Sequence, residues 1–571
     1  MDDTERERWR KPARLSGAEM LLRTLLLEGV ECVFGYPGGA VLYMYDAMHG
    51  NERFRHLLTR HEQGAIHAAD GYARATGKTG VCIATSGPGA TNLVTGIATA
   101  FMDSVPMVVI TGNVASEFTG TDAFQEADIV GITMPITKHN FYVRRAEDVP
   151  RVLRDAFRIA ASGRKGPVLV DIPKDVTAAV ADFTYPDEAP PEPARLAPAA
   201  AAQLERLARR LDESSRPVVL AGGGVVAAEA SAALVGFAER ANVPVTTTLL
   251  GLGGFPGDHP LWLGMPGMHG TYTANTALQE CDLLVSVGAR FDDRVTMKLE
   301  AFAPGADIAH IDIDAAELGK LVPTAYPVAA DAREALNWLQ GRMKPSPRRD
   351  AWVRTLQERK RAFPLAYRDS ETELKPQTVI RTIDRLTGGN AIVTTDVGQH
   401  QMWVAQYYRF LEPRTFLTSG GLGTMGFGFP SAIGAQLGRP DRVVVSINGD
   451  GGMQMCAQEL AVCAIHRIPV KIAVINNGTL GMIRQWQKLI HEERYSQIDL
   501  SGSPDFVKLA EAYGVRGFRA ETPKEAERAW KAALETDGPA LVDFVVARDE
   551  LVYPMVPQGN ALHEMILGGE A

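Results

Sequence analysis

The feature of this sequence that most constrains its fold is a series of short apolar runs separated by stretches with helical periodicity. Eight such runs are clear, at residues 81–85, 107–111, 167–171, 217–221, 283–287, 308–313, 443–447 and 472–475. Unbroken runs rich in β-branched residues between helices are typical of parallel strands that helices cover on both faces. The pattern therefore predicts doubly wound parallel α/β sheets.

The chain is too long for one domain. It has 571 residues, whereas a single hydrophobic core stops growing at about 250–300 residues. A Pro- and Ala-rich segment at 186–202 predicts a linker, and residues 341–376, with prolines at both ends and a charged stretch between, predict a second, partly helical connection. We expect three consecutive doubly wound parallel-sheet domains, at 12–185, 200–345 and 370–550.

Charge and composition exclude several classes of partner. The formal net charge is −9, and no basic run interleaves with aromatic residues, so we expect no nucleic acid and no membrane surface as partner. No apolar run reaches the roughly 18 residues of a membrane span. Residues 1–14 are charged and lack the apolar core of a secretory signal. Five cysteines without CxxC spacing indicate reduced thiols in a cytoplasmic protein.

Two strand ends carry residues that suit a metal ion. The strand at 443–447 is followed by Asn-Gly-Asp-Gly-Gly, which includes Asp450, and the strand at 472–475 is followed by Asn-Asn-Gly-Thr, which includes Asn477. If the strands are neighbours, the two side chains converge at the carboxyl edge of the sheet. Carboxylate, amide and backbone oxygens suit Mg²⁺, and the glycines let backbone N–H groups approach a diphosphate. Either dipeptide alone would be an ordinary turn.

The same two motifs together resemble the signature of thiamine-diphosphate enzymes, in which GDG precedes NN by about 25 residues. Thiamine chemistry needs a carboxyl group that holds a proton on the cofactor's aminopyrimidine ring. Glu62 stands before a helix expected at His67–Thr76, where in isolation it would be a solvated residue. However, the block RHEQGAIHAADGYARATG, followed by TSGPGATN, resembles the pyrimidine-binding domain of this family.

The resemblance covers the chain from Phe34 to Pro554, and within the family it is closest to the acetolactate synthases. It implies a fold of three such domains and gives Glu62 the role of proton relay. The other catalytic residues that it implies are Gln125, Lys174, Arg294, Met425 and Trp486. The residues that it places around thiamine diphosphate are Tyr36, Gly38, Pro88, Asn92, Gly398, Gln399, His400, Gly426, Gly451 and Gly452, with Asp450, Asn477 and Thr479 at the metal.

The middle domain carries a weaker nucleotide signal. Three glycines follow the strand at 217–221, but they lack the GxGxxG spacing of a dinucleotide site. By resemblance to the biosynthetic acetolactate synthases, the domain holds FAD that transfers no net electrons. The residues that match flavin-binding positions are Arg164, Gly222, Gly223, Gly224, Met268, His269, Gly288, Arg290 and Asp312. Arg294 nearby would face the carboxylate of the second substrate, although an exposed Asp-Arg pair is ordinarily a surface ion pair.

The resemblance implies a complete activity. Pyruvate loses CO₂ on thiamine diphosphate, and the hydroxyethyl carbanion attacks pyruvate or 2-ketobutyrate, in branched-chain amino acid biosynthesis. Trp486 would contact the alkyl group of the second keto acid; without the family it could equally be helix packing. One alternative is another enzyme of the superfamily: a pyruvate oxidase, a simple decarboxylase or a glyoxylate carboligase. Glu62 counts against the carboligase, which lacks that carboxylate. The other alternative is a non-catalytic flavoprotein. The family also implies a homodimer or homotetramer, because two chains share each site, and leaves room for a small regulatory subunit.

Overall fold

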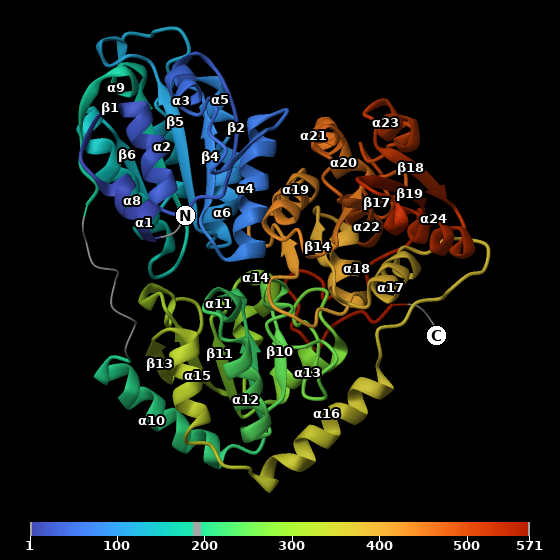
Figure 1. The fold of residues 1–571 in the computed structure, drawn as a ribbon. Coiled ribbons are helices and arrows are strands. Elements are labelled where there is room, and N and C mark those ends of the chain that lie inside the picture. Colours follow the sequence, from blue (N-terminus) through green and yellow to red (C-terminus); the bar gives the residue numbers. More distant parts are fainter. Residues whose placement is uncertain (1–2, 187–195, 569–571) are drawn as a thin grey trace.

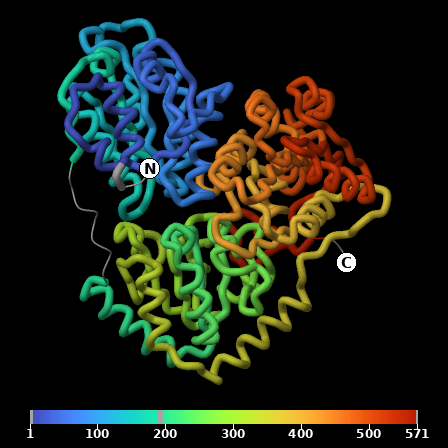
Figure 2. The backbone as a smooth tube through the Cα atoms, viewed as in Figure 1, coloured from blue at the N-terminus to red at the C-terminus, as the bar shows by residue number. Residues whose placement is uncertain are grey.

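The computed structural model describes residues 3–186 and 196–568, which form three α/β units (Figure 1). Each unit contains a parallel sheet with helices packed on it, as the apolar runs predict. The tube in Figure 2 shows that the blue N-terminal unit and the orange C-terminal unit lie side by side, with the green middle unit beneath both. The end of the first unit, near 186, and the start of the second, near 196, lie on the left of this view.

The N-terminal sheet has six parallel strands in the order β3-β2-β4-β5-β7-β6. Their bounds are β2 Cys32–Tyr36, β3 Arg55–Leu58, β4 Gly80–Ala84, β5 Met107–Asn113, β6 His139–Tyr142 and β7 Pro167–Pro173. A separate antiparallel pair joins β1 Ala13–Ser16 to β8 Val180–Phe183. The main covering helices are α2 Gly17–Leu27, α4 Glu62–Thr76, α6 Val94–Met102 and α8 Val149–Ala161.

The middle sheet has five parallel strands in the order β10-β9-β11-β12-β13. Their bounds are β9 Pro217–Ala221, β10 Val245–Thr247, β11 Leu283–Val287, β12 Asp307–Asp312 and β13 Tyr326–Ala329. The main helices are α10 Pro198–Glu213, α12 Ser231–Ala241, α13 Tyr272–Glu280 and α15 Ala332–Gln340. Helix α16, Asp350–Ala362, then leads toward the third unit and makes the second connection partly helical, as its composition predicts.

The C-terminal sheet has six parallel strands in the order β15-β14-β16-β17-β19-β18. Their bounds are β14 Ile392–Thr395, β15 Phe416–Thr418, β16 Val444–Gly449, β17 Lys471–Asn476, β18 Arg516–Ala520 and β19 Ala540–Val545. The main helices are α17 Pro376–Thr387, α18 Gln399–Tyr407, α19 Gly428–Gly438, α20 Asp450–Cys456, α21 Leu460–His466, α22 Gly481–Ile490, α23 Phe506–Ala512 and α24 Pro523–Glu535.

The first and third units share a core through helices α4 and α19. A Cβ at Gly434 would lie 1.7 Å from the carbonyl oxygen of Ala68, and one at Gly71 would lie 2.0 Å from that of Ser431. Only glycine permits such close contact between two helix backbones. The core cluster accordingly contains side chains of both units, including Ile66 and Ile433.

Two local expectations need correction. Part of the predicted linker at 186–202 lies outside the described residues, but its end belongs to α10, which starts at Pro198 because proline is well tolerated in the first turn of a helix. The helix expected at His67 begins earlier, at Glu62 itself. His61 caps it, since its Nδ1 accepts a hydrogen bond from Gln63 N at 3.0 Å. Among the described residues, no helix has the length and apolar character that a membrane crossing needs.

Candidate functional site

Asp450 and Asn477 lie at the ends of two neighbouring strands, as the motif spacing predicts. Strands β16 and β17 pair in parallel, with Gly449 opposite Ile475. Asp450 is the first residue of α20 and is 3% exposed. Its Oδ1 accepts a hydrogen bond from Gly451 N at 3.0 Å, whereas its Oδ2 is buried and has no partner among the described residues. Burial raises the pKa of this carboxyl to about 6, so the site favours a cation or a proton at Oδ2.

The Asn477 turn is ordered by its own hydrogen bonds. Asn477 Oδ1 accepts from Thr479 N at 3.2 Å, and Gly478 between them has a φ of +65°, which favours glycine. The Thr479 hydroxyl donates to Ile498 O at 2.9 Å and is therefore already engaged. No cluster of three or more His, Cys, Asp or Glu side chains that could bind a metal occurs in the described part of the chain. A cation here would thus depend on Asp450, amide and backbone oxygens, and a ligand.

A third strand end, that of β14, adds the predicted residues Gly398, Gln399 and His400 to the same edge. Gln399 donates to Gln485 Oε1 at 2.9 Å and to Glu550 O at 3.0 Å. His400 is buried, and its Nε2 has no partner. Burial lowers the pKa of this imidazole to about 4, so it is neutral at physiological pH and able to donate or accept one further hydrogen bond.

The loop with Met425 and Gly426 closes over this edge. A Cβ at Gly451 would lie 3.6 Å from Met425 Cε, so the methionine packs against the glycine turn. Gly426 N donates to both carboxylate oxygens of Asp396 at 3.0 Å. A Cβ at Gly452 would lie 2.5 Å from Asp396 Oδ2. The predicted residues of the C-terminal unit therefore form one group.

The predicted residues of the N-terminal unit form a second group, around Glu62. Asn92 Nδ2 donates to Glu62 Oε2 at 2.9 Å. Gly38 approaches Thr85 so closely that a Cβ would lie 2.5 Å from its methyl carbon. Gly87, just before Pro88, would similarly place a Cβ 2.9 Å from Gln125.

Tyr36 and Lys174, two further predicted residues of this unit, also lie at the carboxyl ends of strands. Tyr36 ends β2 and is 39% exposed, and Lys174 begins a short helix directly after β7. Among the described residues, no hydrogen bond or ion pair links Glu62 or Asn92 to Asp450 or Asn477. The described residues of the single chain thus form two groups of predicted site residues that no such bond joins.

A pocket of about 890 Å³ lies where the three units meet. Of the nine predicted flavin residues, eight line it, namely Arg164, Gly223, Gly224, Met268, His269, Gly288, Arg290 and Asp312. Gly222 lies just behind, since a Cβ there would be 2.2 Å from Gly288 O. Arg294 and Trp486 line the same pocket.

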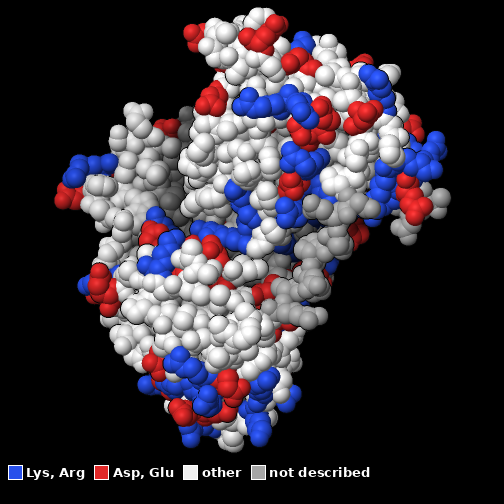
Figure 3. Space-filling view, turned by 90° about the vertical axis from the view of Figure 1, so that its left-hand side faces the viewer, with Lys and Arg blue, Asp and Glu red and all other residues white. Residues whose placement is uncertain are grey.

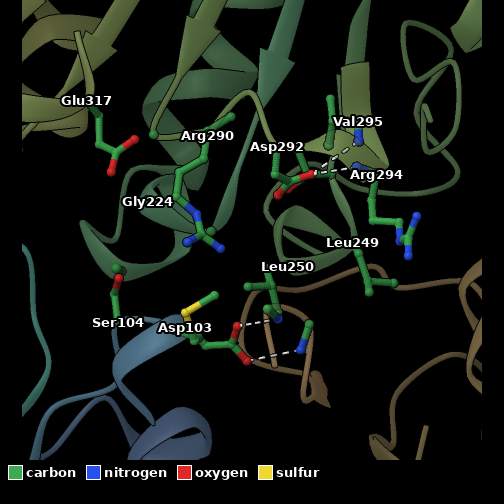
Figure 4. A pocket seen from close by; sticks show the side chains of 18 of the residues that line it. Asp103, Ser104, Gly224, Leu249, Leu250, Arg290, Asp292, Arg294, Val295 and Glu317 are labelled. Atoms are coloured by element: carbon green, nitrogen blue, oxygen red, sulfur yellow. Dashed lines mark hydrogen bonds between the residues drawn. The ribbon is translucent and has the colours of Figure 1, made fainter. Parts of the chain in front are cut away.

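Charged side chains approach this pocket from two units. On the face shown in Figure 3, basic side chains gather along the junction between the upper and lower lobes. Arg164, from the N-terminal unit, is paired with Asp314 at 3.3 Å and Glu317 at 2.9 Å of the middle unit. In Figure 4, Arg290 extends into the space between Gly224 and the pair Asp103 and Ser104.

Backbone hydrogen bonds hold the loops around the pocket. Asp292 accepts hydrogen bonds from Arg294 N at 3.2 Å and Val295 N at 3.1 Å (Figure 4). Asp103 accepts hydrogen bonds from Gly420 N at 3.0 Å and Gly421 N at 2.7 Å. These contacts place Arg294 at the rim of the pocket, where its side chain is 61% exposed.

Sequence reasoning missed two buried carboxyl groups next to the predicted residues. Asp396 follows strand β14, so the same strand-end rule would have identified it. Glu459 carries no such signal, because it reaches across to the N-terminal unit, where both of its oxygens accept from Arg60 N at 3.0 and 3.1 Å. Burial raises the pKa of Asp396 and of Glu459 to about 7. Glu459 thus supports the loop that leads into Glu62.

Comparisons with known proteins find similar sequences over nearly the whole chain. Residues 15–132, 204–339 and 396–544 match the models of the N-terminal TPP binding domain, the central domain and the C-terminal TPP binding domain of thiamine pyrophosphate enzymes. An acetolactate synthase large subunit of Corynebacterium glutamicum is 50% identical over 561 residues, which cover 96% of this chain and 90% of the relative. Those of Lactococcus lactis and Haemophilus influenzae are 48% and 47% identical, covering 96% and 97% of this chain and 96% and 98% of the relatives.

Proposed function

This chain belongs to the acetolactate synthase large subunits of the thiamine pyrophosphate enzyme family, and we propose that it decarboxylates pyruvate and transfers the remaining two-carbon unit to a second 2-keto acid. Pyruvate as second substrate gives 2-acetolactate, and 2-ketobutyrate gives 2-aceto-2-hydroxybutyrate, both in branched-chain amino acid biosynthesis. The observation that carries this proposal is the buried, unpartnered Asp450 Oδ2 beside Asn477 at the sheet edge.

The strand ends fit Mg²⁺ and a diphosphate. Asp450 Oδ2 is free to bind the cation, and the Asn477 amide oxygen and the Thr479 backbone carbonyl are suitable further ligands. Gly451 and Gly452 belong to the first turn of α20, and a helix N-terminus favours phosphate oxygens. Thiamine diphosphate, when bound, supplies the ring that takes up the electrons as CO₂ leaves.

Glu62 is suited to hold and move the proton that activates the cofactor. The Asn92 amide occupies Oε2 at 2.9 Å and so orients the carboxyl group. A Cβ at residue 89 would lie 3.3 Å from the other oxygen, Oε1, so a glycine there leaves that oxygen accessible. Glu62 is only half-buried in the single chain, and burial by a second chain would exclude water from it.

Arg294 and Trp486 are suited to bind the second substrate. Both line the central pocket, and the exposed Arg294 guanidinium can bind a carboxylate with two hydrogen bonds. Trp486, on α22, offers an apolar face for the alkyl group. Gln125 and Lys174 belong to the N-terminal unit and would approach the same substrates from a second chain.

The central pocket fits FAD. Its volume of about 890 Å³ lies in the range of cofactor sites. Gly223 and Gly224 allow backbone N–H groups to approach phosphate, and Arg290 adds a positive charge. Since the proposed reaction transfers no net electrons, the flavin would contribute to structure and stay oxidised.

A homodimer, or a tetramer built from such dimers, completes the site. Large apolar side chains are exposed near both groups: Phe124 is 89% and Leu42 55% exposed in the N-terminal unit, and Met455 is 55% and Ile483 49% exposed in the C-terminal unit. Exposed apolar residues gathered near a site mark interfaces. A second chain could therefore place its Glu62 against Asp450 of this chain. The large-subunit relatives also leave room for a small regulatory subunit.

We assign the enzyme to the cytoplasm. All five cysteines are buried free thiols, which is the usual state in a reducing compartment.

The decisive experiment is an assay with pyruvate alone, in the presence of thiamine diphosphate, Mg²⁺ and FAD. Formation of acetolactate supports the proposal. Acetaldehyde would indicate a simple decarboxylase, and reduced flavin, with acetyl phosphate when inorganic phosphate is added to a parallel assay, an oxidase. Absence of CO₂ release by the loaded protein would exclude this function.

A further inference from the structure

A second pocket, of about 500 Å³, lies apart from the strand ends that form the site above. Its walls come from the middle unit, from the segment after α16 and from helices α17 and α18 of the C-terminal unit. Its volume is within the range of small-molecule sites. None of the residues assigned above to the substrates or to the thiamine cofactor lines it.

The pocket has an excess of positive charge. Its basic and acidic residues are Lys360, Arg381, Arg409 and Asp384, together with His269, whose pKa burial lowers to about 4. Asp384 is already paired with Arg409 at 2.7 Å. Within residues 3–186 and 196–568, Lys360 and Arg381 form no ion pair. Two cations therefore remain without a carboxylate, in a chain whose formal net charge is −9.

Both cations are held in place by neutral groups. Lys360 Nζ donates to Trp262 O at 2.8 Å and lies 5.1 Å from the centre of the Trp262 ring. Burial lowers the pKa of Lys360, because the charged ammonium loses hydration there. The Arg381 guanidinium lies 5.1 Å from the ring of Tyr367 and 5.3 Å from that of Tyr407. These contacts fix the position of each charge and do not neutralise it.

The other residues that line the pocket indicate what a bound anion carries besides its negative charge. Trp262, Phe363, Leu365 and Tyr407 give the pocket apolar walls. Thr273, which is 1% exposed, also lines it, and its hydroxyl is buried without a hydrogen-bond partner. A ligand that matches this lining has an apolar body and one anionic group.

We propose that this pocket binds a small organic carboxylate with an aromatic or branched aliphatic body, whose carboxylate pairs with Lys360 and Arg381. Met265 and His269 line both this pocket and the central one, so an occupant would contact the wall that separates it from the proposed flavin site. The assignment concerns binding alone and stands whether or not the proposed reaction is correct.

The test uses the full-length protein with thiamine diphosphate, Mg²⁺ and FAD present, and 8-anilinonaphthalene-1-sulfonate as a fluorescent probe with an apolar body and one anionic group. We expect saturable binding of one probe per chain. Phenylacetate should displace the probe, whereas phenylacetamide, which has the same body without the charge, should not.

Matched variants locate the binding. Arg381→Gln and Lys360→Gln should each weaken binding about tenfold or more, the effect expected for losing one charged hydrogen bond. Arg385→Gln on the same helix as Arg381, and Arg361→Gln beside Lys360, remove a charge outside the pocket and should leave the affinity unchanged. Arg381→Lys should retain most of the affinity.

Arg381 is exposed, and with the residues that the structure describes its side chain forms only ring contacts, so its replacement should not disturb folding. Absence of saturable binding overturns the proposal. So does equal affinity in Arg381→Gln and Arg385→Gln, which would place the probe elsewhere, for example in the central pocket. Equal displacement by the acid and the amide would also contradict it, because the charge would then play no part.

Discussion

Replacing Gly434 by alanine should separate the N-terminal and C-terminal units at their closest contact. The added Cβ would lie 1.7 Å from Ala68 O, and real Cβ atoms essentially never come within 3.0 Å of such an atom, so α4 has to retreat by about 1.3 Å. Neither contact atom can yield alone, because both belong to helix backbones. Overpacking of this kind costs about 1–3 kcal/mol.

The displacement should reduce activity more than stability. Helix α4 begins at Glu62, and α19 follows the loop of Met425 and Gly426, so separating the helices displaces these residues in the two sites that each would complete with a second chain. A misplacement of about 1 Å in a catalytic group can lower the rate by roughly 10²-fold. We therefore expect Gly434→Ala to remain folded with a lowered melting temperature, and to consume pyruvate roughly 10²-fold more slowly at saturating substrate.

The matched control is Gly341→Ala, in which the nearest atom to the added Cβ would be 3.6 Å away and the backbone has negative φ. This control should keep wild-type activity. Gly71→Ala, which makes the equivalent clash with Ser431 O, should reproduce the effect of Gly434→Ala. Wild-type kcat and melting temperature in Gly434→Ala would refute the reasoning, because the two helices would then not be in fixed contact.

Four further predictions concern single side chains. Glu62→Gln should bind the cofactor but slow exchange of its C2 proton by roughly 10²–10⁴-fold, because an amide cannot relay a proton; NMR exchange at the wild-type rate would contradict this role. Asp450→Ala should abolish Mg²⁺-dependent binding of thiamine diphosphate, since it removes the only charged protein ligand at the proposed metal site, and unchanged affinity in isothermal titration would exclude it as the metal ligand. Trp486→Leu should lose most of any preference for 2-ketobutyrate over pyruvate as second substrate, because one methylene accounts for about 1–3 kcal/mol of discrimination. The ratio of the two products in a competition assay measures this preference, and an unchanged ratio would make Trp486 a packing residue. Burial raises the pKa of Glu459 from an ordinary 4.5 to about 7, so the folded protein binds this proton more tightly than the unfolded chain does. The folded protein therefore loses stability as pH rises from about 4.5 to about 7. Glu459→Gln should remove up to about 3 kcal/mol of that loss, and parallel melting curves for both proteins at pH 5 and pH 8 would show that the carboxyl titrates normally.

Much of the fold could be predicted from the sequence because its signals are local. The runs at 217–221 and 283–287 coincide with β9 and β11, since a strand buried on both faces must be apolar throughout. The Asp450 and Asn477 turns follow from the same logic, because neighbouring parallel strands end at one edge. The start of α4 was misplaced, because its cap is a histidine and not one of the usual capping residues.

The class of sheet and the strand ends that carry Asp450 and Asn477 follow from local sequence patterns, and the thiamine chemistry follows from resemblance. How the units are joined follows from their packing. The contact of Gly434 with Ala68, the reach of Glu459 to Arg60 and the hydrogen bond of Lys360 to the Trp262 carbonyl join residues that are far apart along the chain. Such contacts leave no periodic pattern, because the packing of one element against another sets them and their spacing in sequence does not.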